Sequence, residues 1–324
     1  MPQPSAPPKI QHHVPVEGRR RAAWIAGGVL LASLAAFGFG LYRYGWDGGV
    51  TQVVTKVLPY PAAIVEGRVI RYSEYQEDLT VLERFYETER GRAAAGSVFP
   101  TQEELKRRVL DRLIKDQLAA ALAERYGVAV SADDVKATYD ATILEQTSLD
   151  TAGGKARAEA RAAETLEQLY GLRPSQFKTR VLHPFLVRQG LEAAIRDDEA
   201  LNVEKRKKAE AALAELQAGK DFKGVALAYS EDPGVTANGG DRGLIGRGLL
   251  APEVEAAAFS LKDGETSGVV KSQFGYHILR VTEHQEQNGA TTKIHLHEIL
   301  VRPIQLDDYL EAQKKTASII IFVQ

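Results

Sequence analysis

The residues best suited to chemistry lie between Lys220 and Val281, in short blocks that combine carboxylates, glycines and one histidine. Asp232 precedes a proline in a turn-like segment, and His277 begins an apolar run, so each can engage a polar group of a ligand. The chain has no cysteine, which excludes disulfides and thiolate metal sites. The blocks stand in the order Tyr229-Ser-Glu-Asp-Pro233, Asn238-Gly-Gly-Asp241, Glu255-Ala-Ala-Ala-Phe-Ser-Leu261 and Gln273-Phe-Gly-Tyr-His277.

These four blocks, in this order and at this spacing, resemble the parvulin (PpiC-type) peptidyl-prolyl isomerases along the whole stretch. The resemblance implies an enzyme that acts on, or a domain that at least binds, the X-Pro bonds of unfolded polypeptides. Rotation about such a bond meets a barrier of about 18–20 kcal/mol, which arises from amide resonance. A catalyst therefore needs an apolar slot for the proline ring and polar groups for the twisted amide. It needs no cofactor.

The resemblance also implies roles for single residues. Asp232 falls at the Asp/Cys position near the substrate carbonyl, and His277 falls at the histidine of the last strand. Leu250 falls where the family places a Met or Leu in the proline slot. Phe259 and Phe274 are assigned to the apolar side of the site, and for Phe259 a core role is favoured over contact with the substrate.

Three departures from the family pattern leave a second hypothesis open, that of a parvulin domain that binds unfolded chains without isomerising them. Arg242 replaces the leucine of the family's Gly-Asp-Leu-Gly, and Val254 replaces a phenylalanine. The opening strand of the family is absent, because Leu201-Asn-Val-Glu-Lys-Arg runs directly into the helix expected at Lys205–Gly219.

The missing strand has a candidate at the other end of the domain, Lys293-Ile-His-Leu-His-Glu-Ile-Leu-Val301. Asn288-Gly289 predicts a two-residue hairpin before it. That hairpin pairs His277 with Leu300 and Leu279 with Glu298, so all four side chains share one face. Glu298 then takes the place of a family histidine, and the domain is interpreted as circularly permuted. The alternative, a second repeat that begins at Ile294, leaves too few residues for a domain.

His295 and His297 lie on one strand face, opposite to His277 in this register, with His284 nearby in the sequence. Such a pair is usually solvated or at an interface, so the sequence predicts no metal site. A length of 324 residues predicts about two domains, and the net charge of −2 gives no electrostatic case for nucleic acid.

An uncharged stretch at 22–42 follows Arg19-Arg20-Arg21 and is long enough to cross a hydrocarbon core of about 30 Å. We expect an uncleaved transmembrane signal-anchor at 19–45, a disordered cytoplasmic tail at 1–18, and exported C-terminal domains, which predicts a single-pass cell-membrane protein. The alternative is a signal peptide cleaved after Ser33-Leu34-Ala35.

A linker is expected at 46–62, and residues 63–70 suggest a short hairpin. Helical spacing then predicts helices at Tyr72–Arg92, after Thr101 and after Ser131, both as N-caps, and at Ala152–Leu169. The stretches Leu105–Val135 and Gly171–Ile195 resemble the helical chaperone domain of the SurA type, which is therefore assigned to residues 63–200. The expected fold is α+β: a transmembrane helix, this all-α domain, a parvulin domain with a small antiparallel sheet at 201–301, and a C-terminal tail at 302–324.

Overall fold

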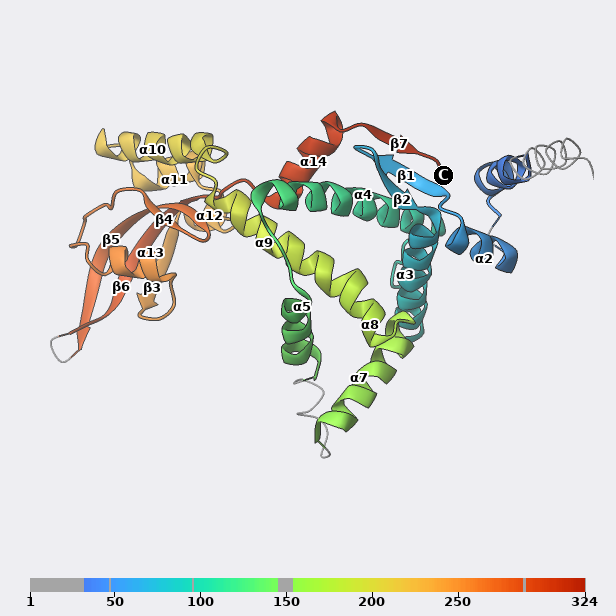
Figure 1. The fold of residues 1–324 in the computed structure, drawn as a ribbon. Helices are drawn as coiled ribbons and strands as arrows, with labels where there is room; N and C mark the ends of the chain where they lie inside the picture. Colours follow the sequence, from blue (N-terminus) through green and yellow to red (C-terminus); the bar gives the residue numbers. More distant parts are fainter. Residues whose placement is uncertain (1–31, 47, 95, 145–153, 288–289, 324) are drawn as a thin grey trace, which may run out of the picture. The chain divides into compact units, whose positions relative to one another are not determined.

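The structure is a computed structural model that describes residues 32–46, 48–94, 96–144, 154–287 and 290–323. The chain divides into two compact units. One comprises Met1–Thr80, Pro100–Leu110 and Ser318–Gln324, and the other comprises Val81–Phe99 and Asp111–Ala317. Figure 1 labels their helices and strands. The expected domain limits at 62/63 and 200/201 stay a prediction.

The first unit contains a three-stranded antiparallel sheet in the order β2-β1-β7. β1 (Pro61–Val65) and β2 (Arg68–Arg71) form the hairpin that the sequence predicts. Glu66 and Gly67 turn between them, both with positive φ, which glycine adopts at little cost. β7 (Ile319–Ile321) pairs with the other edge of β1, so the last residues of the chain complete this sheet.

The prediction of a transmembrane helix is wrong. Its first ten positions, 22–31, lie outside the described residues, and residues 32–44 are helical. Within the described part of the chain, no helix combines the length and apolar character needed to cross a membrane. Part of the apolar surface of the 32–44 helix serves packing within its own unit, since Leu41 is buried and the ring of Phe37 contacts that of Tyr60. The α+β class of the remaining fold agrees with the prediction.

Next to this helix in the first unit is α2 (Gly49–Val57), which lies within the expected linker. The long helices that follow are α3 (Tyr72–Arg92), which has the predicted bounds, and α4 (Gln102–Tyr126), which follows the predicted cap. Thr101 and Glu104 form that capping box, because each side chain bonds the backbone N–H of the other.

The helical part of the second unit continues with shorter elements around a core that includes Tyr139, Leu166 and Phe177. Ser131 caps the first of them, as predicted. A π-helical turn at Lys178–Leu182 leads directly into the helix that begins at His183-Pro184. The elements are α5 (Ala132–Tyr139), a π-helical turn (Asp140–Leu144), α7 (Gly154–Tyr170), α8 (Pro174–Phe177), α9 (His183–Asp197) and α14 (Leu306–Thr316).

The residues expected as a C-terminal tail carry ordered elements. α14 forms ion pairs with α4 through Lys314–Asp111 and Glu311–Lys115.

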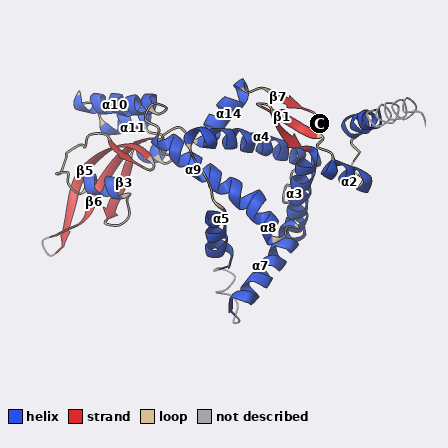
Figure 2. Cartoon of the chain, in the orientation of Figure 1, coloured by secondary structure: helices blue, strands red, loops and turns tan. Residues whose placement is uncertain are grey.

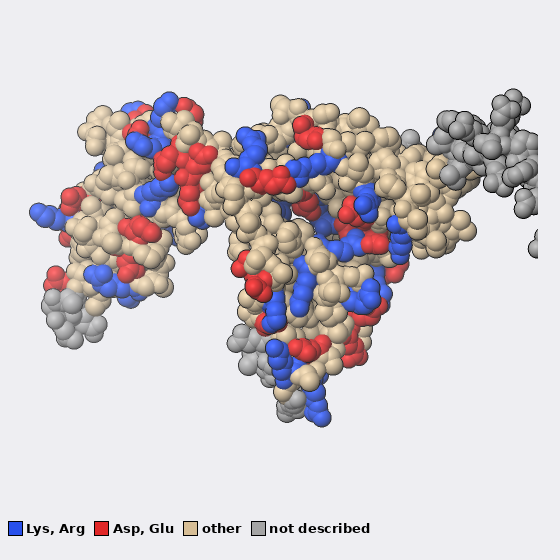
Figure 3. Space-filling model, in the orientation of Figure 1, with Lys and Arg blue, Asp and Glu red and all other residues tan. Residues whose placement is uncertain are grey.

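Positive and negative side chains are interspersed on the face drawn in Figure 3, so that face presents no field of a single sign.

The second sheet belongs to the second unit and has the antiparallel order β3-β6-β5-β4. Its strands are among those drawn in red in Figure 2. Its strands are β3 (Asp241–Gly246), β4 (Val270–Ser272), β5 (Gly275–Gln287) and β6 (Ala290–Val301). β6, the strand predicted to be displaced, lies between β3 and β5. The predicted register is confirmed, because His277 pairs with Leu300 and Leu279 pairs with Glu298.

Helices cover both faces of this sheet. α10 (Val203–Gln217) and α11 (Phe222–Tyr229) pack on the face of Ile278 and Ile299. α13 (Pro252–Ala258) packs on the opposite face, where Val254 contacts the cluster around Leu279 and Leu296. A short helix, α12 (Val235–Asn238), precedes β3.

A fully buried asparagine ties the end of α9 to the segment that follows β6. The Asn202 side-chain amide donates to the carbonyl oxygens of Ile195, at 2.7 Å, and Asp198, at 3.0 Å. Its oxygen accepts from the backbone N–H of Ile304 at 2.8 Å. Because these bonds join segments about a hundred residues apart, Asn202 fixes the position of the chain that leaves the sheet.

Candidate active site

His277 lies at the centre of a buried polar group on the α13 face of the sheet. Only 3% of its surface is exposed, and both ring nitrogens have partners. Nε2 lies 2.6 Å from the hydroxyl oxygen of Ser272, and Nδ1 lies 2.6 Å from Oε1 of Glu298. The imidazole is therefore fixed in orientation by neighbours on the two strands beside its own, β4 and β6.

Arg242 extends this group toward solvent. Its Nε lies 3.5 Å from Oε2 of Glu298, and its Nη1 donates to Oδ2 of Asp232 at 2.8 Å. A continuous polar chain thus runs from His277 through Glu298 and Arg242 to Asp232. The slot leucine of the family is replaced here by a cation held between two carboxylates.

The loop after α11 positions Asp232 by bonding to β6. The Ser230 hydroxyl accepts from the N–H of Leu300 at 3.1 Å, and the N–H of Glu231 donates to the Leu300 carbonyl at 2.6 Å. Oδ1 of Asp232 accepts from the N–H of Gly234 at 2.7 Å. The carboxylate is therefore held at one oxygen by its own turn and at the other by Arg242.

Glu231 anchors the same loop to α10 and to the end of β6. Lys205 and Lys208 donate to its carboxylate at 3.1 and 2.8 Å, and the N–H of Arg302 donates at 2.9 Å. Burial alone would raise the pKa of Glu231, but these hydrogen bonds outweigh burial and lower it.

A cavity of about 590 Å³ opens beside this polar group. Most of the residues that the sequence assigns to the site line it: Asp232, Arg242, Leu250, Val254, Phe274, His277 and Glu298. Its other lining residues come from α9, from the loop before α13, from the turn after β4 and from the end of β6 with the segment that follows it: Glu192, Arg196, Leu249, Ala251, Gln273, Leu300, Arg302, Pro303, Ile304 and Gln305.

Phe259 is the assigned residue that does not line this cavity. It packs against the core cluster of Val254 and Leu279, with the guanidinium carbon of Arg247 4.1 Å from its ring centroid. This is the core role that the sequence favours for Phe259. Val254 belongs to both environments, since it lines the cavity and is 2% exposed.

Sequence reasoning missed Ser272 and the contribution of α9. Ser272 stands directly before the block that contains His277, and the β4–β5 hairpin brings the two side chains together. A polar residue at the start of that hairpin was the available signal. Glu192 and Arg196 carried no local signal, because only the tertiary arrangement brings α9 to the cavity.

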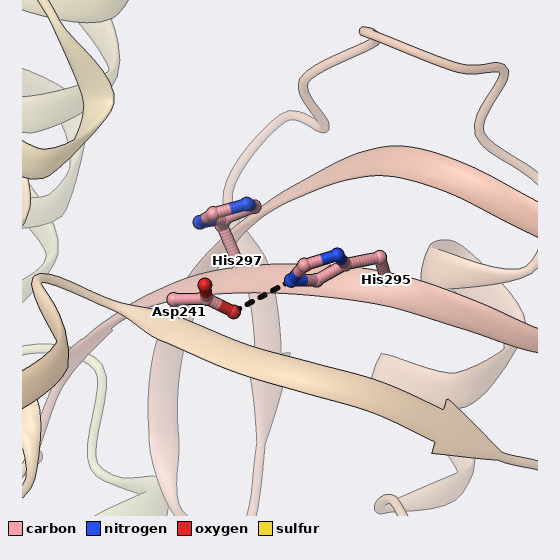
Figure 4. Close-up of side chains that lie close together, drawn as sticks. All are labelled: Asp241, His295 and His297. Carbon is pink, nitrogen blue, oxygen red and sulfur yellow. Dashed lines mark hydrogen bonds and ion pairs between the residues drawn. The ribbon is translucent and has the colours of Figure 1, made fainter.

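The opposite face of the sheet brings together the residues that the structure offers as possible metal ligands. These are Asp241 on β3 with His295 and His297 on β6 (Figure 4). They lie on the side of α11, where the ring of Phe222 contacts that of His297. This group is separate from the cavity.

The cavity can hold a proline ring against Leu250 and Val254 while Asp232 and His277 stand on its polar side. Such an arrangement favours a twisted amide over a planar one, provided that the polar groups contact the carbonyl or nitrogen as the amide rotates. It needs no covalent step.

Comparison with known proteins agrees with both parts of the chain. Residues 191–283 match the PPIC-type PPIase domain family, and residues 18–191 match the SurA-like N-terminal domain family. The two resemblances inferred from the sequence are thereby confirmed. The first match ends before β6, so it does not include Glu298.

Individual relatives cover different shares of the chain. The foldase protein PrsA of Geobacillus kaustophilus is 44% identical over 87 residues, which make up 27% of this chain and 31% of the foldase. The chaperone SurA of Methylococcus capsulatus is 28% identical over 286 residues, 78% of this chain and 61% of the chaperone. The chain thus spans only part of the length of these relatives.

A solved structure of the peptidylprolyl isomerase PrsA from Bacillus cereus covers 80% of this chain and 83% of its own, at 19% identity and a TM-score of 0.25. That score is too low to carry an argument about the fold. The SurA-like match, by contrast, covers more than half of the 324 residues. The chain therefore belongs to the family of proteins with a SurA-like N-terminal domain, and this domain is followed by a PpiC-type peptidyl-prolyl isomerase domain.

Proposed function

We propose that this protein is a peptidyl-prolyl cis-trans isomerase and folding chaperone that acts on X-Pro bonds of unfolded polypeptides. The observation that carries the proposal is the cavity that joins the buried His277 and the anchored Asp232 to the apolar Leu250 and Val254. These are the two kinds of surface that a twisted prolyl amide requires.

The arrangement of the sheet supports a further part of the proposal, a circular permutation of the parvulin domain. β6 lies between β3 and β5, where it supplies Glu298 beside His277. In the ordinary family a histidine of the first strand lies beside the last-strand histidine. β6 takes over the place of that first strand, with glutamate in place of histidine.

We also propose that the chain is exported and works on secreted or envelope proteins. The support is Arg19-Arg20-Arg21 followed by apolar residues, a pattern typical of secretion signals. A protease-protection assay on intact and permeabilised cells tests this proposal. Equal digestion of the isomerase domain in both samples supports export, and digestion only after permeabilisation of the cytoplasmic membrane contradicts it.

One specific observation favours a second candidate function, a holdase that binds unfolded chains without isomerising them. Arg242 occupies the position of the slot leucine, and its guanidinium pairs with the carboxylate of Asp232. A salt bridge at that position makes the slot more polar and engages the group assigned to the substrate carbonyl.

The refolding of a substrate protein whose slow phase is set by prolyl isomerisation separates the two functions. We expect the slow-phase rate to rise in proportion to the concentration of the full-length protein, since catalysis bypasses the amide barrier. A parallel assay measures suppression of aggregation of an unfolded protein. Suppression with an unchanged slow phase would reject the isomerase and leave the holdase.

A further inference from the structure

Three side chains on paired strands converge on the α11 face of the second sheet. Asp241 of β3 pairs directly with His297 of β6, and His295 stands two residues earlier on the same face. The two imidazole rings are stacked, with centroids 5.3 Å apart and planes at 12°. Figure 4 shows the Asp241 carboxylate beside both rings. One potential ligand atom of each residue lies within 4.8 Å of those of the other two.

From this geometry we propose that Asp241, His295 and His297 form a binding site for a divalent transition-metal ion of the zinc class. Two imidazoles and one carboxylate are a common ligand set for Zn²⁺, with a fourth position left for water. Bonds of about 2.0–2.2 Å in a tetrahedron place ligand atoms about 3.3 Å apart. Side-chain rotation on the paired strands therefore has to bring the three ligand atoms from within 4.8 Å of one another to about 3.3 Å apart.

Neighbouring groups hold the Asp241 carboxylate and the ring of His297 in place. Oδ1 of Asp241 accepts from the N–H of Gly243 at 2.8 Å and from Nε2 of His295 at 2.8 Å. His297 is half-buried, and its ring contacts that of Phe222 with centroids 5.7 Å apart.

One nearby charge opposes a cation. Arg280 is the partner of His297 on β5, on the side away from Asp241. Its guanidinium donates to the Thr266 hydroxyl at 2.7 Å and lies 5.2 Å from the ring centroid of Phe222. These contacts keep the guanidinium of Arg280 on Thr266 and Phe222 rather than on the proposed ligands. Its positive charge therefore weakens cation binding without filling the site.

The proposed metal site lies back to back with the isomerase cavity. Side chains alternate along a strand, so Asp241 and His297 face α11 while their neighbours Arg242 and Glu298 face the cavity. The ligands are thus separate from the assigned catalytic groups. The site can be tested without altering the isomerase residues.

Titration of the full-length protein with CoCl₂, followed by competition with ZnCl₂, tests the proposal through visible absorption. The protein used for the titration, and every variant compared with it, carries His12→Gln and His13→Gln. These substitutions remove the adjacent histidine pair near the start of the chain. We expect one equivalent of Co²⁺ to produce ligand-field bands that Zn²⁺ abolishes. Loss of an outer-shell partner typically costs about 10–100-fold in affinity, so His295→Gln and His297→Gln are expected to weaken binding at least that much.

The matched control is His284→Gln, since His284 lies on β5 and pairs with Asp263 instead. It is expected to bind Co²⁺ as the parent does. NMR of the histidine side chains gives a second readout that does not depend on removing a ligand. In the protein that keeps His295 and His297, Zn²⁺ should shift the signals of these two residues and leave those of His277 in place. Absence of stoichiometric binding, or binding of Co²⁺ by His295→Gln and His297→Gln as tight as in the protein that keeps both histidines, would overturn the proposal.

Discussion

Nδ1 of His277 and Oε1 of Glu298 lie 2.6 Å apart in a site where both side chains are buried. A buried histidine with partners at both nitrogens cannot rotate without breaking one of two hydrogen bonds. Glu298 therefore holds the imidazole in place and also carries the negative charge that Arg242 faces.

Glu298→Leu removes the partner of two polar groups and replaces it by an apolar side chain. We expect the free energy of unfolding to fall by about 1–3 kcal/mol, the usual cost of a buried polar group left unsatisfied. Urea unfolding measures it. Glu298→Gln, which keeps the size and some hydrogen bonding, is the matched control and should lose less. Equal stability of all three proteins would show that the pair does not hold the site.

Asp232→Ala is expected to lower kcat/KM for a prolyl peptide by about one order of magnitude or more, because an anchored polar group at the reacting amide is lost. Its stability should change little, since the residue lies in a surface turn. The control is Asp263→Ala, a carboxylate paired with His284 outside the cavity. If both variants keep full activity, Asp232 has no part in catalysis.

Arg242→Leu restores the apolar residue of the family at the slot and should raise kcat/KM for a prolyl peptide. Its ion pair with Asp232 is partly exposed and contributes little to stability, but the buried Glu298 also loses the cation 3.5 Å away, so urea unfolding of the variant is measured beside its activity. Val254→Phe is a poorer test, because Val254 is 2% exposed and added volume in a packed core costs about 1–3 kcal/mol. A fall in activity with Arg242→Leu would place the guanidinium in the working site.

Deletion of residues 290–324 should abolish cooperative unfolding of the second sheet. It removes β6 from between β3 and β5, and with it the fully buried Ile294, Leu296 and Ile299. The strands on both sides then lose their hydrogen-bond partners. Deletion of 318–324, which removes only β7, is the control. A sheet that still melts cooperatively in the longer deletion would contradict the permuted arrangement.

Acid should weaken the loop that carries Asp232. Hydrogen bonds hold the pKa of Glu231 below its ordinary value of 4.5, so its contribution to stability is present above pH 4.5 and is lost as the pH falls through the folded-state pKa. The midpoint of urea unfolding for the parent should therefore exceed that of Glu231→Gln at neutral pH. The two midpoints should converge at pH values well below 4.5. A difference that stays constant with pH would show that the charge of Glu231 is not responsible.

The register of the β5–β6 hairpin could be predicted from the sequence because its information is local. Asn288-Gly289 indicates a two-residue turn, and the alternation of side chains then assigns every pair up to His277. Two bulges interrupt the pairing nearer the turn, but they leave the pairs of His277 and Leu279 as predicted.

The rest of the site depends on contacts that no local pattern encodes. Glu192 reaches the cavity only through the packing of α9, and Asp241 meets His297 only because β6 pairs with β3. The wrong prediction of a membrane span arose because a local pattern was given more weight than tertiary packing. An uncharged run satisfies a length rule, yet residues such as Leu41 within it are buried against the protein itself.

The strand order has a consequence for synthesis. β1 and β2 are made early, but their sheet also takes β7, Ile319–Ile321, while β3, β4 and β5 wait for β6. A chain that emerges from the ribosome N-terminus first therefore completes neither sheet until its last strands have been translated. β6 and β7 thus complete the two sheets late in synthesis. A ribosome that stalls before β6 leaves a nascent chain in which the edges of β1 and β5 are unpaired and open to quality-control factors.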